Sequence, residues 1–194
     1  MDGYKLALTL HILAVMALFI GAGLVVVALG GARRAKTVAS LREWAAMGAV
    51  VNRLLPLFGL VALAPAIYMV QDRWGWKTQW VNAAFTALIV ALALAPVLIQ
   101  PRLRALTRAA DAAADGPVPA VLRRLTFDPL LWLGVQTLTT LMTGIVVLMT
   151  FKPDGAASGI VIVCAALLGV LATAPAFSRY KRFQTDAPSA RVSA

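Results

Sequence analysis

Long runs of apolar residues alternate along this chain with short segments that carry most of its charge. At about 1.5 Å per residue, each run is long enough for a helix to cross the roughly 30 Å hydrocarbon core of a bilayer. The pattern predicts five transmembrane helices, at about residues 6–29, 45–70, 81–100, 129–151 and 157–177. The predicted fold class is therefore all-α, an integral membrane bundle of one helix followed by two hairpins.

The boundaries of these helices follow from local signals. The first run is longer than the roughly 7–15 apolar residues of a cleaved signal peptide, so we expect it to stay as a helix. Pro101 is expected to close the third helix, and Asp128 is expected to cap the fourth. Residues 102–124 are expected to form a polar loop with a short surface helix that ends at Gly116. Residues 1–183 would then be a single transmembrane domain, and 184–194 a disordered cytoplasmic tail.

Two segments of the chain resemble each other at an offset of 79 residues. LALAPVLIQPRLRAL at 92–106 aligns with LATAPAFSRYKRFQT at 171–185, with an Ala-Pro pair in register. The two hairpins that contain them would share one orientation, as in a parallel repeat. The alternative is coincidence, because Ala-Pro pairs near helix ends are common in alanine-rich chains.

The composition supports a membrane location. Of the 194 residues, 61% are hydrophobic and 13% are charged, and the mean hydropathy is +0.83. Soluble domains are nearer one quarter charged. The net charge of +10 does not indicate nucleic-acid binding, because the basic residues lie between apolar runs and form no stripe interleaved with aromatic residues.

The distribution of basic residues predicts the orientation. Fourteen of the 18 fall within residues 31–53, 101–127 and 178–194, which all lie on one side of a five-helix bundle. Basic residues favour the cytoplasmic side, so we expect the N-terminus outside and the C-terminus inside. Tryptophans between the second and third helices would then form an outer aromatic belt. The preference for arginine over lysine, with abundant alanine, suggests a GC-rich bacterial genome and hence the inner membrane.

His11 is the first candidate for chemistry, because an ionisable side chain inside a span is costly and often functional. It is expected to lie near the outer boundary, at a depth similar to that of Cys164, with Met69 at the outer end of the second helix and Met16 one turn deeper. Imidazole with thioether or thiolate ligands suits Cu(I) or a heme iron. Alternatively, His11 hydrogen-bonds a neighbouring carbonyl, and the methionines are packing residues.

The fourth helix carries a polar stripe, formed by Gln136, Thr140 and Thr143 at i, i+4 and i+7. Such a stripe can line a polar pathway, although interhelical hydrogen bonding is the more frequent use. The chain has one histidine and one cysteine, which excludes an intramolecular disulfide and histidine clusters within one subunit.

Several segments resemble known bacterial membrane proteins. KLALTLHILAVMALFIGAG and the basic residues after it resemble the start of copper-resistance D-like proteins. AIYMVQDRWGW, QPRLRAL and LMTGIVVLMTFKP resemble a family of predicted integral membrane proteins of unknown function in that loose group. Related groups transport copper or bind heme with a histidine early in the first helix. The resemblance therefore implies a metal or heme role for His11 alone, because the further histidines of those groups are absent here.

Four functional hypotheses remain open from the sequence. The first is a multi-pass protein without catalysis of its own, which binds a hydrophobic or metal-bearing ligand near the outer face. The second is a heme or copper protein that uses His11. The third is a small permease. The fourth is an accessory subunit, acting as a homo-oligomer or within a membrane complex.

The predicted orientation can be tested with reporter fusions in a bacterial host. A fluorescent protein fused after residue 194 should fluoresce, because it stays in the cytoplasm, and alkaline phosphatase fused there should be inactive. Phosphatase inserted between the second and third helices should be active. The opposite pattern at either position would contradict the predicted topology.

Overall fold

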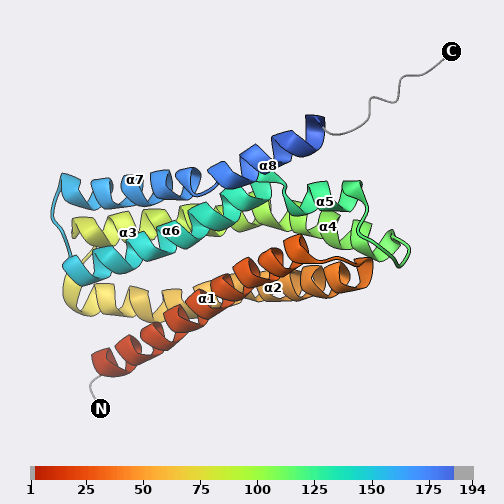
Figure 1. Cartoon of the computed structure of the whole chain (residues 1–194). Helices are drawn as coiled ribbons and strands as arrows, with labels where there is room; N and C mark the ends of the chain where they lie inside the picture. Colours follow the sequence, from red (N-terminus) through yellow and green to blue (C-terminus); the bar gives the residue numbers. More distant parts are fainter. Residues whose placement is uncertain (1–2, 186–194) are drawn as a thin grey trace.

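A computed structural model describes residues 3–185, and it confirms the all-α class (Figure 1). Within these residues, five helical segments are long and apolar enough to cross a membrane. The elements are α1 (Gly3–Arg34), α2 (Val38–Met69), η1 (Val70–Trp74), α3 (Gln79–Leu94), η2 (Ala95–Ile99), α4 (Gln100–Ala112), α5 (Ala120–Thr126), α6 (Pro129–Phe151), α7 (Ala156–Leu171) and α8 (Ala174–Thr185). The two η elements are π-helical turns, so α2 and η1 form one continuous rod and α3, η2 and α4 form another.

The helices are longer than the apolar pattern predicted. Residues 38–44, expected before the second helix, are the first turns of α2, and Thr37 caps it by accepting a hydrogen bond from the Ser40 N–H at 3.3 Å. The expectation that Pro101 ends the third helix is wrong, because the rod continues to Ala112. A proline removes its own N–H from the ladder and crowds the carbonyl four residues before it, which for Pro101 is that of Val97 in the widened turn of η2. Much of the predicted polar loop is therefore helical.

The end of the chain differs in a similar way. The backbone of α8 extends to Thr185, so the first two residues of the predicted tail belong to a helix. The remainder of that tail, 186–194, lies outside the described residues. The two Ala-Pro pairs of the proposed repeat both fall where a helix is irregular, one inside η2 and the other at the start of α8.

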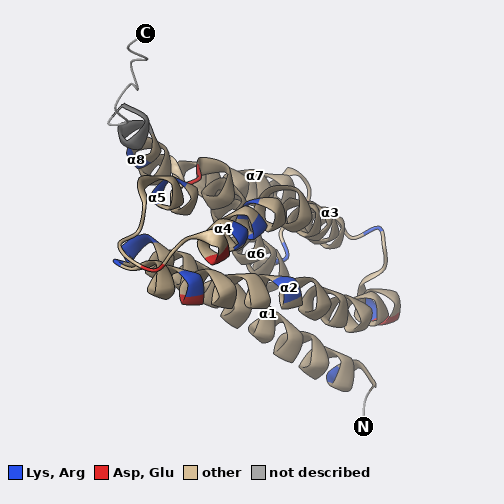
Figure 2. Cartoon of the chain, turned by 90° about the vertical axis from the view of Figure 1, so that its right-hand side faces the viewer, with Lys and Arg blue, Asp and Glu red and all other residues tan. Residues whose placement is uncertain are grey.

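The bundle has two unlike ends. The basic end is the one where α1 finishes and α2 starts, and the tryptophan end is the one that contains η1. Figure 2 looks onto the basic end, where the ribbon positions of Lys and Arg residues gather on the connections and on α2 and α4. The long helices behind it are almost free of charge along their middle parts. This separation is what a bilayer requires, because charged groups in its core are costly.

Two connections are paired at the basic end. The Val38 N–H donates to the Gly116 carbonyl at 2.9 Å, and the Val118 N–H donates to the Lys36 carbonyl at 3.2 Å. Gly116 adopts a φ of 147°, which residues with a side chain rarely adopt. Arg42 adds hydrogen bonds to carbonyls at the end of α4. The α1–α2 connection is thus fixed to the α4–α5 connection.

Arg33 ties the end of α1 to the start of α6. Its guanidinium carbon lies 3.4 Å from the ring centroid of Trp132 and 4.5 Å from that of Phe127. Its Nε donates to the Thr126 carbonyl at 3.3 Å. Arginine stacks well on aromatic faces and is weakly hydrated, so this sandwich suits a partly buried position at the edge of the membrane.

Helix α7 packs on α6 through small residues. A Cβ added at Gly169 would lie 2.5 Å from the Thr137 Cα and 2.6 Å from the Thr140 Oγ1. Close approach of small residues is a principal source of helix association in membranes, where lipid is as apolar as the side chains. Gly169 therefore sets the distance between the two helices.

We expect Gly169→Ala to lower the free energy of unfolding by about 1–3 kcal/mol, because the added methyl meets backbone that cannot move aside freely. The matched control is Gly159→Ala on the same helix, where a Cβ would have no neighbour within 4 Å among the described residues. Thermal unfolding in detergent, followed by circular dichroism, measures both. Equal unfolding temperatures for the two variants would contradict the close contact.

Candidate functional site

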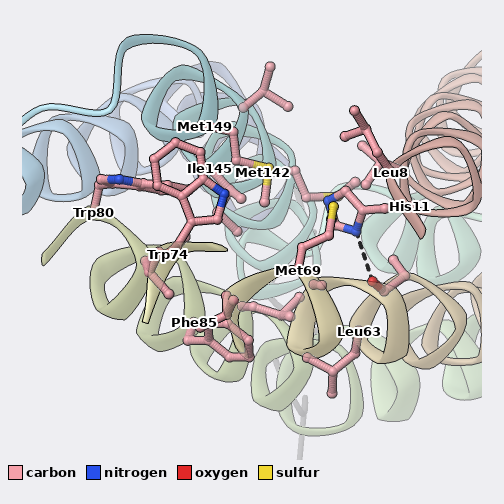
Figure 3. Close-up of a pocket in the computed structure, with 18 of the residues that line it drawn as sticks. Leu8, His11, Leu63, Met69, Trp74, Trp80, Phe85, Met142, Ile145 and Met149 are labelled. Carbon is pink, nitrogen blue, oxygen red and sulfur yellow. Dashed lines mark hydrogen bonds between the residues drawn. The ribbon is translucent and has the colours of Figure 1, made fainter. Parts of the chain in front are cut away.

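A cavity of about 290 Å³ opens in the tryptophan-end half of the bundle, between α1, α2, α3 and α6 (Figure 3). Leucine, valine, alanine, methionine and aromatic side chains form most of its wall. Small residues make room for it, since Ala62 and Ala66 face it from α2 and Ala84 faces it from α3. Its size is at the lower limit of typical small-molecule sites.

His11 is the polar group that α1 contributes to this wall. Its side chain is 8% exposed, and its Nδ1 lies 2.8 Å from the Ala62 carbonyl oxygen on α2. Pro65, one turn along α2, lacks the N–H that would bond to the carbonyl of Val61, so one bond of the helix ladder is missing near Ala62. The bond joins α1 to α2 about 12 Å along α1 from its first described residue.

The hydrogen bond fixes the protonation of the imidazole. A carbonyl oxygen can only accept, so Nδ1 must carry the proton that it shares with Ala62. In the neutral ring, Nε2 is then an acceptor with a lone pair. Nε2 is buried and has no hydrogen-bond partner within residues 3–185. Buried polar atoms are seldom left in this state, so Nε2 is the most informative atom of the cavity.

Three methionines share the cavity with His11. Met69 comes from the end of α2, and Met142 and Met149 come from positions two turns apart on α6. Figure 3 shows His11, Met69 and Met142 directed into the same space. Thioethers are soft, polarisable and weak acceptors, so this wall combines one nitrogen lone pair with adaptable sulfur atoms.

Aromatic residues close the other end of the cavity. The rings of Trp74 and Trp80 meet edge to face with centroids 5.2 Å apart, and the Lys152 Nζ lies 4.2 Å from the Trp74 ring centroid. The π-helical turn of η1 carries Trp74 and is closed by the Gly75 N–H on the Val70 carbonyl, at 2.6 Å. Such widened turns occur often at functional sites. The cavity thus has an imidazole at its deeper end and a cation with indoles near its mouth.

The residues predicted to bind a cofactor are not all brought together. His11 and Met69 both line the cavity. Met16 instead lies on the outer surface of α1, 54% exposed, and Cys164 is exposed on α7. A bundle surface of this kind faces lipid, so Met16 and Cys164 are separated from His11 by the helices that carry them.

The polar stripe on α6 bonds mainly to its own helix. The Thr140 hydroxyl donates to the carbonyls of Gln136 and Thr137, and the Thr143 hydroxyl donates to the carbonyl of Thr139. Thr143 is exposed, and Gln136 and Thr140 are half-buried. The 290 Å³ cavity is lined by other residues of α6. The hydroxyls of Thr140 and Thr143 thus donate to carbonyls of their own helix, as threonine hydroxyls do in many membrane helices.

Sequence reasoning missed Met142, Trp74, Trp80 and Lys152 as members of this site. One signal was present, because Met142 and Met149 are seven residues apart and so share a face of α6. No pattern along one helix shows which face of another helix it meets, and that pairing decides the membership of the cavity.

No protein-family model, curated protein or solved structure matches this chain. The resemblance to copper-resistance D-like proteins therefore stays a prediction. Within the described residues, no group of three or more histidine, cysteine, aspartate or glutamate side chains could hold a metal ion. A metal at this site would need thioether ligands besides His11.

We expect His11→Leu to lower the free energy of unfolding by about 0.6–1.7 kcal/mol, the range of interhelical hydrogen bonds in membrane proteins. The matched control is Ile12→Leu, one residue along and exposed on the outer surface. Thermal unfolding of both variants without added ligand measures the difference. A His11→Leu variant as stable as the control would show that the bond to Ala62 contributes little.

Proposed function

We propose that this multi-pass membrane protein binds a small, largely apolar ligand in the cavity, anchored on His11. The observation that carries the proposal is the state of the imidazole. It is more than nine-tenths buried, its Nδ1 is bonded to Ala62, and its Nε2 is buried at the wall of an apolar cavity with no partner in residues 3–185. A histidine that served packing alone would have both nitrogens satisfied or one in contact with water.

The size of the cavity supports a ligand of modest dimensions. An apolar cavity of roughly 150 Å³ can hold benzene, so about 290 Å³ has room for a bicyclic aromatic molecule or a compact aliphatic one. A bound molecule of this size would add packing contacts to the apolar wall.

The composition of the wall favours binding rather than catalysis. Its titratable members in the described part of the chain are Tyr4, His11 and Lys152, and no carboxylate or thiol lines it. General acid–base or nucleophilic chemistry usually requires paired groups within hydrogen-bond reach. We place the protein in the inner membrane of a bacterium with this cavity toward the outer side, a placement supported by the basic residues at the other end.

A heme or copper role is the second candidate. A metal-ligating histidine commonly donates its other N–H to a carbonyl, as the His11 Nδ1 does toward Ala62. Nε2 with the thioethers of Met69, Met142 and Met149 is a donor set that fits Cu(I), and a histidine–methionine pair also fits a heme iron. Either group would add redox chemistry, whereas the residues themselves would bind and orient it.

The ligand proposal is tested with naphthalene, a probe without polar groups, titrated into the protein in lipid nanodiscs. The wild type should show saturable binding above that of empty nanodiscs. Ala66→Leu should weaken it at least about tenfold, because the larger side chain fills the cavity. The control is Ala64→Leu, two residues away and exposed. Equal affinity in the two variants, or absence of saturable binding in the wild type, would contradict the proposal.

The metal candidate has its own readouts. Protein purified from its native membranes should show a Soret band or about one copper per chain if that candidate is correct, and His11→Leu should lose either signal. The candidate is removed if the wild-type protein shows neither signal, even after reconstitution with Cu(I) or heme. The apolar-ligand proposal would then remain in place.

A further inference from the structure

On the basis of the proposed function, we propose that the cavity selects ligands that donate a hydrogen bond to Nε2 of His11. The ligand class is an apolar alcohol, phenol or hydroquinone rather than the matching ether, ketone or quinone. The juxtaposition that carries this inference is a carbonyl on one side of the imidazole and an apolar cavity on the other (Figure 3).

The direction of the Ala62 bond determines what the cavity can recognise. The carbonyl has no proton, so Nδ1 is the donor across the 2.8 Å contact. The second nitrogen of a neutral imidazole is then unprotonated and can only accept. His11 could present a donor to the cavity only by losing the Ala62 bond or by taking a second proton.

In the neutral ring, the imidazole offers one lone pair to the ligand, because Nδ1 carries the proton that is shared with the Ala62 carbonyl. The other titratable side chains on the cavity wall in the described part of the chain are Tyr4 and Lys152.

A hydrogen-bond acceptor in an apolar site favours ligands that donate to it over ligands that do not, because leaving the acceptor unpaired costs free energy. A hydroxyl group replaces the missing hydrogen bond of Nε2, whereas a fluorine, ether or carbonyl group leaves Nε2 unpaired or repels it. The resulting preference for a hydroxyl group should lie between roughly 5-fold and 150-fold in affinity.

The mouth of the cavity has the opposite hydrogen-bonding character. Lys152 and the indole N–H groups of Trp74 and Trp80 are donors without acceptor capacity. A molecule with a hydroxyl group at one end can therefore be oriented with that end toward His11. Its hydroxyl oxygen could also accept a bond near the mouth, and the experiment has to separate these two contacts.

The test compares 2-naphthol with 2-fluoronaphthalene, which is similar in shape and cannot donate, by calorimetric titration of the full chain in nanodiscs. Binding to empty nanodiscs is subtracted for each probe. We expect the wild type to prefer 2-naphthol by at least about 5-fold. His11→Phe should abolish the preference while it retains affinity for 2-fluoronaphthalene, and Ile12→Phe, its exposed neighbour, should keep the preference.

Lys152→Met completes the design, because it removes the cation at the mouth and leaves His11 in place. The preference for 2-naphthol should persist in this variant. The same measurement tests the inference if His11→Phe does not fold. Equal affinities of the two probes in the wild type, or a preference lost in Lys152→Met, would overturn the inference. Saturable naphthalene binding in the same samples would show that the proposed function still holds.

Discussion

The absence of water from the core of a bilayer is the constraint on which this structure depends. Each polar group at that depth must find its partner inside the protein, because lipid offers none. Thr140 and Thr143 of α6 do so by bonding to carbonyls of their own helix. Most charged side chains lie towards the two ends of the bundle. Against this background, an imidazole with one satisfied and one unsatisfied nitrogen within residues 3–185 is informative.

The site is produced by a few local departures from regular helix packing. Pro65 removes one bond from the ladder of α2 near Ala62, and the widened turn of η1 carries Trp74 to the end of the cavity. Alanines on α2 and α3 leave the space that larger side chains would fill. These residues therefore create a largely apolar volume beside His11.

The two ends of the bundle have different tasks. At the basic end, Arg33 lies between the rings of Phe127 and Trp132, and the connections around Gly116 and Lys36 are hydrogen-bonded to each other. These contacts hold α1, α2, α4 and α6 together and leave little free volume. At the tryptophan end the helices diverge around the cavity. A fixed end and an open end are a suitable arrangement for a ligand site, because the scaffold stays in place whether or not the cavity is filled.

The sequence by itself determined the number of spanning helices, the segregation of charge and the position of His11 inside a spanning helix, because each of these follows from the cost of exposing polar groups to lipid. It placed Met69 beside His11 by depth. The prediction that the third helix ends at Pro101 was wrong, because the pattern of apolar residues does not show that a π-helical turn lets the helix continue past a proline. Only the tertiary structure decided that Met142 rather than Met16 shares the cavity, and that the Ala62 carbonyl fixes the tautomer of His11. The rotation of each helix about its axis is set by packing against its neighbours, and an apolar helix surrounded by lipid has too little contrast between its faces to show that rotation in advance.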